Sequence, residues 1–139
     1  MRYVLDTNIL VAGLRSPAGA SAALLGLAMT GAFTPLLSVP LVLEYEAACC
    51  DPKQRAASGL DETGVRVVID TLCDAGQTVV PHFLWRPLLR DANDEMVLEA
   101  AINGRADGLV TFNRRHFADA ALQFGIELLN PGDALRRIS

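Results

Sequence analysis

Acidic side chains recur at three separate places in this 139-residue sequence, and together they could bind a cation. Asp6 follows the apolar run at 3–5, and Glu44 interrupts an apolar helical turn. Asp91 and Asp94 open a later helical pattern. Several carboxylates that meet at one place repel one another unless a divalent cation that prefers oxygen ligands, such as Mg²⁺ or Mn²⁺, binds among them. The pattern therefore favours a metal site.

Each acid also has a structural explanation when it is taken alone. Asp6 is a suitable N-cap for the helix that follows it. Glu44 is compatible with the solvent-exposed side of an amphipathic helix, because charged side chains are rarely buried unpaired. Asp91 and Asp94 are acids of the kind that a helix N-terminus favours electrostatically. Only the combination of these acids shifts the interpretation toward a metal site.

Thr111 and Asn113 form a second group of polar residues, at the end of the strand expected over 108–111. In an open parallel sheet, ligands bind beyond the carboxyl ends of the strands, which is where Asp6 also falls. We therefore expect Thr111 and Asn113 to face the same cleft as Asp6 and to orient a ligand or a water molecule. The alternative is a strand end that is capped by turn-forming residues.

The elements that must position these residues alternate between strand and helix. Strands are expected at 3–5, 34–39, 78–80, 108–111 and 126–129. Helices are expected from about residue 9 and at 21–29, 40–50, 62–72, 94–102 and part of 114–124, with a loop at 53–61 and turns at 86–92. This alternation predicts an α/β fold with a mostly parallel central sheet flanked by helices on both faces. The length predicts a single domain over 1–139.

The net charge of −4 argues against a protein that coats nucleic acid, because non-specific affinity for phosphates comes from clustered Lys and Arg. Any contact with RNA must therefore be local. Arg114, Arg115 and His116 form a basic cluster that could bind RNA phosphates at the rim of the cleft, the alternative being a solvated helix face. His82 follows Pro81 in an expected loop and is interpreted as structural.

The cysteine pattern and the apolar stretches indicate a cytoplasmic protein. The three cysteines, at 49, 50 and 73, match neither a disulfide framework nor a metal-ligand spacing, so we expect reduced thiols that pack in the interior. Apolar stretches such as 20–32 are shorter than the roughly 20 residues that a membrane helix needs, and the N-terminus lacks the pattern of a signal peptide. The apolar second helix suggests that another chain covers part of the surface.

Four segments, at 5–10, 44–45, 90–101 and 106–113, together resemble the PIN-domain family in their order and over nearly the whole chain. They look most similar to the VapC-like toxin components of type II toxin-antitoxin systems. The resemblance implies a parallel sheet between helices, with an acidic pocket that holds Mg²⁺ or Mn²⁺ and hydrolyses RNA phosphodiester bonds. It also implies a homodimer that is neutralised by a cognate antitoxin protein.

The same resemblance implies roles for individual acids. Asp6, Glu44 and Asp94 match the core catalytic acids and metal ligands, and Asp91 matches an additional acid that is a further candidate ligand. Asn113 stands where many members of the family carry an Asp. An amide can coordinate a cation or hold a water molecule, but it brings no charge, so binding of a second metal stays open.

Two supporting residues and two alternative functions complete the interpretation. Thr111 matches the hydroxyl of the family pattern, and Asn8 matches the polar residue that supports the first acid. The expected reaction is an in-line displacement at phosphorus by a cation-activated water. One alternative is a catalytically weak or inactive PIN-like protein that binds RNA or acts as a scaffold, with Asn113 as the reason. The other is a phosphatase with Asp6 as nucleophile, which leaves most of the other acids unexplained.

Overall fold

Five short parallel strands form the centre of the structure, a computed structural model that describes residues 1–80, 89 and 91–138. The strands of this described part are β1 (Arg2–Leu5), β2 (Thr34–Leu37), β3 (Gln77–Thr78), β4 (Gly108–Val110) and β5 (Glu127–Leu129). Their order across the sheet is β3-β2-β1-β4-β5, and every neighbouring pair is parallel. The prediction of a mostly parallel sheet is confirmed.

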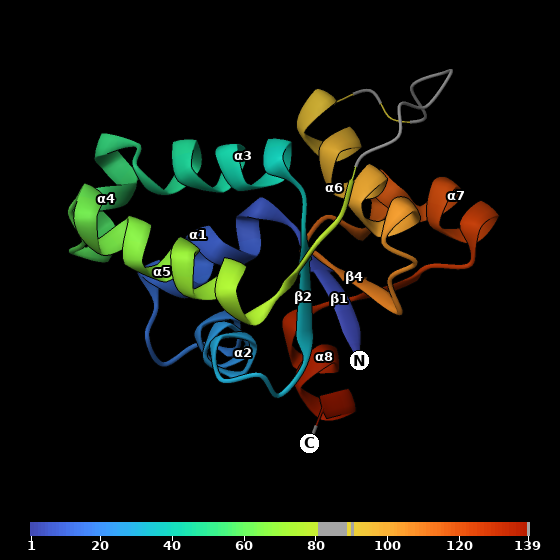
Figure 1. The fold of residues 1–139 in the computed structure, drawn as a ribbon, viewed down its shortest axis with the longest axis horizontal. Helices are drawn as coiled ribbons and strands as arrows, with labels where there is room; N and C mark the ends of the chain where they lie inside the picture. Colours follow the sequence, from blue (N-terminus) through green and yellow to red (C-terminus); the bar gives the residue numbers. More distant parts are fainter. Residues whose placement is uncertain (81–88, 90, 139) are drawn as a thin grey trace.

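Two layers of helices cover the sheet (Figure 1). In one layer, α6 (Ala92–Asn103) packs on β1, β2 and β4, while α7 (Arg114–Phe124) packs on β5 and against α6. The other layer contains α1 (Thr7–Arg15), α2 (Ala20–Met29), α5 (Glu62–Ala75) and α8 (Pro131–Ile138). α3 (Val39–Cys49) and α4 (Pro52–Ser58) pack against α1, and α3 also contacts α5 and α6. In Figure 1, α1, α2 and α5 lie to the left of the central strands, and α6 and α7 lie to their right. Helices therefore flank both faces of the sheet, as predicted.

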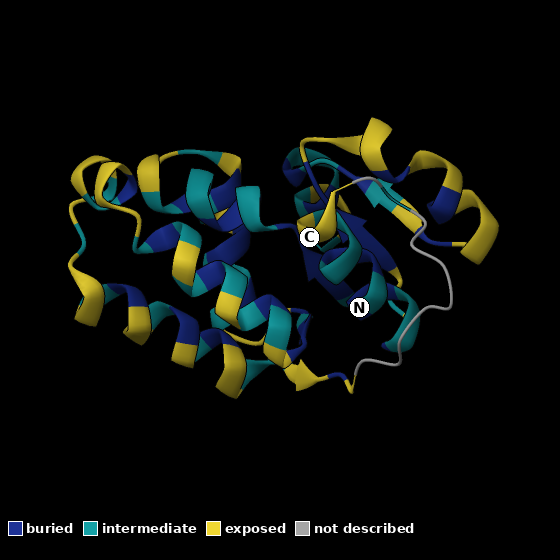
Figure 2. Ribbon diagram, turned by 90° about the horizontal axis from the view of Figure 1, so that it is seen from above, coloured by how far each residue is buried: buried dark blue, intermediate teal, exposed yellow. Residues whose placement is uncertain are grey.

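The core lies along the central strands, which are apolar because both of their faces are covered. Val4, Leu109 and Val110 are fully buried, as is Phe117 of α7. Figure 2 shows the same distribution, with buried residues along the strands and exposed residues on the outer sides of the helices. The described residues contain no single helix that is long and apolar enough to span a membrane. α1 and α2 pass that test only as a pair, and the chain bends by 107° between them.

The direction of the chain connections reverses between β1 and β4. The connection after β1 leads through α1 and α2 to β2, whereas the connection after β4 leads through α7 to β5 on the other side. At such a reversal the two connections diverge and leave a crevice at the carboxyl ends of the strands, which is where α/β proteins bind ligands. The register pairs Leu5 with Val110. Asp6 and Thr111, the next residue on each strand, therefore lie side by side at this crevice.

The prediction of a loop at 53–61 was wrong, because α4 occupies most of this segment. Asp51 caps this helix by accepting hydrogen bonds from two of its first amides, at 3.1 and 3.4 Å. The proline that follows occupies the first helical position, and Gly59 ends the helix with a φ of 76°. Gln54 is buried because its side-chain amide donates to the carbonyl of Val11 at 2.9 Å. The polar composition of the segment 53–61 had suggested a solvent-exposed loop.

The other elements lie where the pattern predicts them, with shifted boundaries. α1 and α6 each begin two residues earlier than expected. β2 ends at Leu37 rather than at residue 39, since Ser38 caps α3 by accepting a hydrogen bond from an amide of its first turn at 3.3 Å. His82 and most of the turns expected at 86–92 lie outside the described residues.

The three cysteines are free thiols. Cys49 is buried, and burial raises its pKa to about 11, so the thiol stays protonated as suits a packing residue. Cys73 is exposed, so the prediction that all three cysteines pack in the interior was wrong. It lies near the C-terminal end of α5 and lines an open groove beside α3, where its thiol is accessible to solvent.

Candidate active site

Asp6 is held at the crevice by both its backbone and its side chain. Its amide donates to the carbonyl of Val110 at 2.9 Å, which continues the β1–β4 ladder by one residue. The Thr111 hydroxyl donates to Oδ2 of Asp6 at 2.6 Å. The side chain of Asp6 makes no capping hydrogen bond to α1, although Asp6 occupies the N-cap position. With only 5% of its surface exposed, this carboxylate is therefore not explained by helix capping.

Thr111 fixes the start of α7 as well as the Asp6 side chain. It is fully buried, and its hydroxyl accepts a hydrogen bond from the Asn113 amide at 2.9 Å while it donates to Asp6. The Asn113 carbonyl in turn accepts from the His116 amide at 3.0 Å. The Asn113 side chain makes no cap bond to α7 and is exposed, so its carboxamide is available to a ligand.

Asp94 and His116 connect the first turns of α6 and α7. Nδ1 of His116 lies 3.1 Å from Oδ2 of Asp94. The Asp94 side chain is 14% exposed, whereas that of His116 is 55% exposed. Sequence analysis placed His116 in an RNA-binding cluster and missed this contact. The predicted sheet was a usable signal, because α6 and α7 both start at the carboxyl edge of the strands.

The charge of Asp94 also reaches Asp6. Burial is the main reason that the pKa of Asp6 is raised above its ordinary value of 3.8, and the negative charge of Asp94 raises it further. The Thr111 hydrogen bond and the positive charge that His116 can carry act in the opposite direction. Ionised Asp6 is therefore a carboxylate under repulsion, which is the condition that a bound cation relieves.

We expect Asp94→Asn to lower the pKa of Asp6 toward its ordinary value, because the substitution removes a nearby like charge. Carbon-detected NMR titration of the Asp6 carboxyl group in metal-free protein measures this shift directly. Asp119→Asn, an exposed acid on α7, removes the same charge elsewhere and serves as the control. An Asp6 pKa that stays the same in both variants would show that the two site carboxylates do not interact.

Tyr45 anchors α3 to the end of β1. Its hydroxyl donates to the carbonyl of Leu5, the residue before Asp6, and its ring is buried. Burial raises the pKa of Tyr45 well above its ordinary value of 10, so the hydroxyl keeps its proton and remains a donor. The preceding residue, half-buried Glu44, is carried on the same anchored turn. Sequence analysis noted the Glu44–Tyr45 pair without finding this anchor.

Asp91, the remaining predicted acid, has a structural role. Asp91 is exposed and caps α6, accepting a hydrogen bond from the Asn93 amide at 2.8 Å. The position of Asp91 at the N-terminus of α6 therefore accounts for this acid, as the structural alternative predicted. Within the described residues, no three His, Cys, Asp or Glu side chains lie close enough to form a metal-binding group. The structure thus places Asp6 and Asp94 near enough for their charges to interact, and it does not gather Glu44 or Asp91 with them into a three-carboxylate cluster.

The oxygen atoms around Asp6 nevertheless suit a hard divalent cation. Oγ1 of Thr7 and Oδ1 of Asn8 are buried and have no hydrogen-bond partner within the part of the chain described. Both residues belong to the first turn of α1, directly after Asp6. Buried polar atoms normally find a partner, often a bound water or ion. The carboxylates of Asp6 and Asp94, and the unsatisfied oxygens on the two residues that follow Asp6, are donors of the type that Mg²⁺ or Mn²⁺ prefers.

Comparison with protein families matches this chain to one family model, described as PIN domain, over residues 2–115. The chain belongs to the PIN-domain family. No curated protein matches the sequence. PIN domains are generally nucleases and typically use divalent metals, which places this chain among nuclease-type hydrolases and favours that class over the phosphatase alternative. In this PIN domain, β5 and α8 lie beyond the matched range, yet β5 completes the sheet beside β4.

Proposed function

We propose that this PIN domain is a metal-dependent endoribonuclease that hydrolyses RNA phosphodiester bonds and acts as the toxin of a type II toxin-antitoxin system. The observation that carries the nuclease proposal is the Asp6–Asp94 pair at the crevice between β1 and β4. Asp6 is buried, repelled by Asp94 and oriented by Thr111. A divalent cation that binds there would relieve the repulsion and stabilise the ionised form of Asp6.

The helices around the crevice favour an anionic substrate. α1 begins directly after Asp6, and α7 begins directly after Asn113. Helix N-termini carry a partial positive charge and exposed backbone amides, so they bind phosphate groups. Arg114 and Arg115 are exposed on the first turn of α7 and add two positive charges at the same edge. This local positive charge offsets the net negative charge of the chain where RNA must approach.

The residues of this chain divide the catalytic work. Asp6 and Asp94, with Glu44 as the proposed third ligand, would hold Mg²⁺ or Mn²⁺, which when bound supplies Lewis-acid activation for phosphodiester hydrolysis. Thr111 keeps the Asp6 carboxylate in one orientation through its hydrogen bond. The carboxamide of Asn113 is exposed and makes no cap bond to α7, and its proposed role is to hold a water molecule or a phosphate oxygen. Arg114, Arg115 and the outer face of His116 bind the RNA backbone.

The test of the nuclease proposal is cleavage of a panel of single-stranded and structured RNAs in Mg²⁺, Mn²⁺ or EDTA. We expect metal-dependent cleavage by the wild-type protein and loss of cleavage in Asp94→Asn. Asp119→Asn removes an exposed acid from α7 and should cleave normally. Cleavage in EDTA, or equal activity of the two variants, would contradict the proposed role of Asp94.

A second candidate function is RNA binding without cleavage. It is favoured by one observation, that no three metal-ligating side chains gather in the described residues. The uncharged Asn113 weakens metal binding further. Tight binding of RNA by the wild-type protein, with no cleavage at millimolar Mn²⁺, would establish this second function instead.

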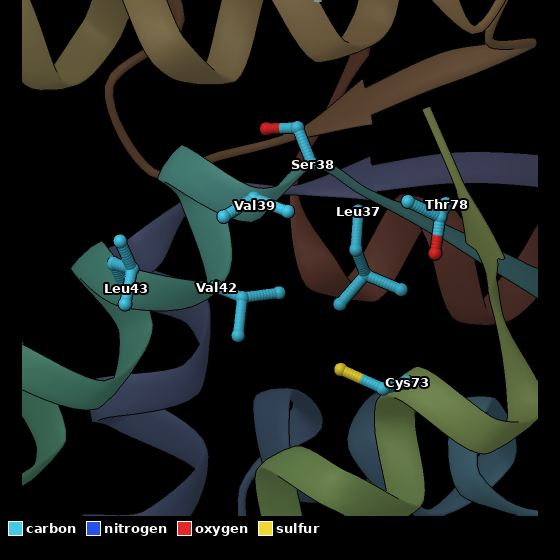
Figure 3. Close-up of a pocket in the computed structure, with 7 residues that line it drawn as sticks. All are labelled: Leu37, Ser38, Val39, Val42, Leu43, Cys73 and Thr78. Atoms are coloured by element: carbon cyan, nitrogen blue, oxygen red, sulfur yellow. The ribbon is translucent and has the colours of Figure 1, made fainter. Parts of the chain in front are cut away.

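We propose that a second copy of the chain and an antitoxin protein cover apolar surface. An exposed groove of about 200 Å³ between α3 and α5 supports a partner (Figure 3). Leu37, Val42 and Cys73 line it, while Val39 and Leu43 on α3 are 63% and 61% exposed. Exposed apolar surface of this kind commonly marks a contact with another protein. Growth arrest on induced expression, relieved by the product of a neighbouring gene, would test the toxin assignment.

A further inference from the structure

A second cavity, of about 370 Å³, opens at the carboxyl ends of β4 and β5, next to the candidate active site. Phe112 lines it from the turn between β4 and α7, and Ala12 lines it from α1. Ala20 and Ser21 contribute from the first turn of α2, and Asn130 contributes from the residue before α8. The cavity is large enough for a small planar ligand, since ligand pockets start at about 300 Å³.

Phe112 is unusual because the residue is 52% exposed although both of its neighbours are fixed by hydrogen bonds. Thr111 before it binds Asp6, and the Asn113 amide after it binds Thr111. The backbone at Phe112 is therefore fixed relative to the Asp6 carboxylate. A large aromatic side chain that is exposed at a fixed position contributes little to the core, and it offers a flat apolar surface to a ligand.

We propose that this cavity binds one unpaired nucleobase of the RNA substrate, with the Phe112 ring as the stacking surface. The inference rests on the proposed ribonuclease function and adds a binding subsite to it. Proteins that bind single-stranded RNA stack bases on aromatic side chains and contact their edges with polar groups. Ser16 and Asn130 supply such polar groups here. Oδ1 of Asn130 accepts a hydrogen bond from the Asp133 amide at 2.7 Å, which holds the carboxamide in place.

The spacing along α1 limits how far this base can lie from the scissile phosphate. Ala12 lies six residues after Asp6, which corresponds to about 9 Å along the helix axis. That distance is too short for a remote part of the RNA and too long for the cleaved phosphate itself. The base in the cavity therefore belongs to a nucleotide close to the scissile phosphate, and the subsite contributes to the choice of cleavage position.

The experiment measures RNA affinity without cleavage, by fluorescence anisotropy in EDTA with a series of single-stranded oligonucleotides. Each oligonucleotide lacks the base at one position, and the cleavage position is known from the wild-type reaction. Removing the base at one position near the cleaved bond should weaken wild-type binding by about 5- to 150-fold. Phe112→Ala should weaken binding of the intact strand by a similar factor and make the protein insensitive to that missing base.

Three further variants separate stacking from a general loss of structure. Phe112→Trp retains a stacking surface and should bind the intact strand like wild type. Ala20→Leu fills the cavity without changing Phe112 and should weaken binding. Leu122→Ala removes an apolar side chain that is 85% exposed on α7 and should leave binding unchanged. Melting temperatures of all variants show that they are folded.

Two results would overturn the subsite, and they differ from failure of the proposed function. If wild type binds and cleaves RNA while Phe112→Ala remains sensitive to every missing base, the subsite is wrong and the nuclease stands. If wild type neither binds nor cleaves any RNA, both fall. Loss of a protein partner in Phe112→Ala with unchanged RNA affinity would assign the cavity to a protein contact and overturn the nucleobase proposal.

Discussion

Replacing Asp6 by asparagine is expected to reduce RNA cleavage by about a thousandfold, and at the same time to stabilise the metal-free protein at neutral pH. The kinetic effect follows from removing the buried charge that is proposed to hold the cation, because metal activation is worth several kcal/mol in the transition state. Asparagine retains an oxygen that can accept the Thr111 hydrogen bond. Single-turnover cleavage rates, measured with a substrate from the RNA panel, test this expectation. Undiminished cleavage would remove Asp6 from the mechanism.

The stability effect has a defined sign. The pKa of Asp6 is raised in the folded chain, so the folded state binds a proton more tightly than the unfolded state does. The stability that this proton provides is fully present below the ordinary value of 3.8 and is lost as pH rises through the raised pKa. An asparagine side chain at this position carries no charge at any pH. The melting temperature of Asp6→Asn should therefore exceed that of wild type at pH 7, and the difference should shrink toward pH 4.

Metal addition provides the control for that measurement. Mg²⁺ or Mn²⁺ at saturating concentration should raise the melting temperature of the wild-type protein, because a ligand that binds only the folded state stabilises it. The same metal should raise the melting temperature of Asp6→Asn much less. Equal responses of the two proteins would place the metal elsewhere, and no response of either would count against a formed site.

Gly76→Ala should destabilise the fold by about 2–4 kcal/mol, the largest stability effect that we expect from adding a single methyl group. Gly76 joins α5 to β3, and its φ of −99° is available to any residue. The constraint is space: an added Cβ would lie 2.4 Å from the carbonyl oxygen of Pro35 and 2.5 Å from a methyl group of Leu37. Since the Pro35 oxygen belongs to the backbone of β2, the contact is relieved only by moving α5 away from the sheet.

Gly26→Ala is the matched control for this substitution. Gly26 lies inside α2, and an added Cβ would meet no atom within 4 Å. Alanine in a helix interior is more favourable than glycine by about 0.5–1 kcal/mol, so this variant should be more stable than wild type. Urea denaturation of the three proteins gives both differences. Similar stability of the two variants would show that α5 is not packed against β2 as closely as described.

The sequence predicts the architecture better than the site. Alternation of apolar runs indicated the parallel sheet, and the polar residues after β1 and β4 indicated the cleft, because both signals are local. α4 was missed because the polar side chain of Gln54 is buried by a partner far along the chain. The Asp94–His116 contact and the exposure of Phe112 depend on how α6 and α7 meet at the sheet edge. No local pattern encodes that arrangement.

The pairing of β1 with β4 delays formation of the crevice until late in folding. The hydrogen bond between Thr111 and Asp6 joins residues that are 105 positions apart, and the ladder beneath it has the same span. Contacts between residues so distant in sequence form late, because closing a long loop costs entropy before the contact returns any energy. During synthesis, a chain that has completed α1 to α5 still lacks half of its catalytic crevice. For the proposed ribonuclease, we therefore expect a nascent protein that stays inert until most of its length has been translated, which delays RNA cleavage while the chain is still attached to the ribosome.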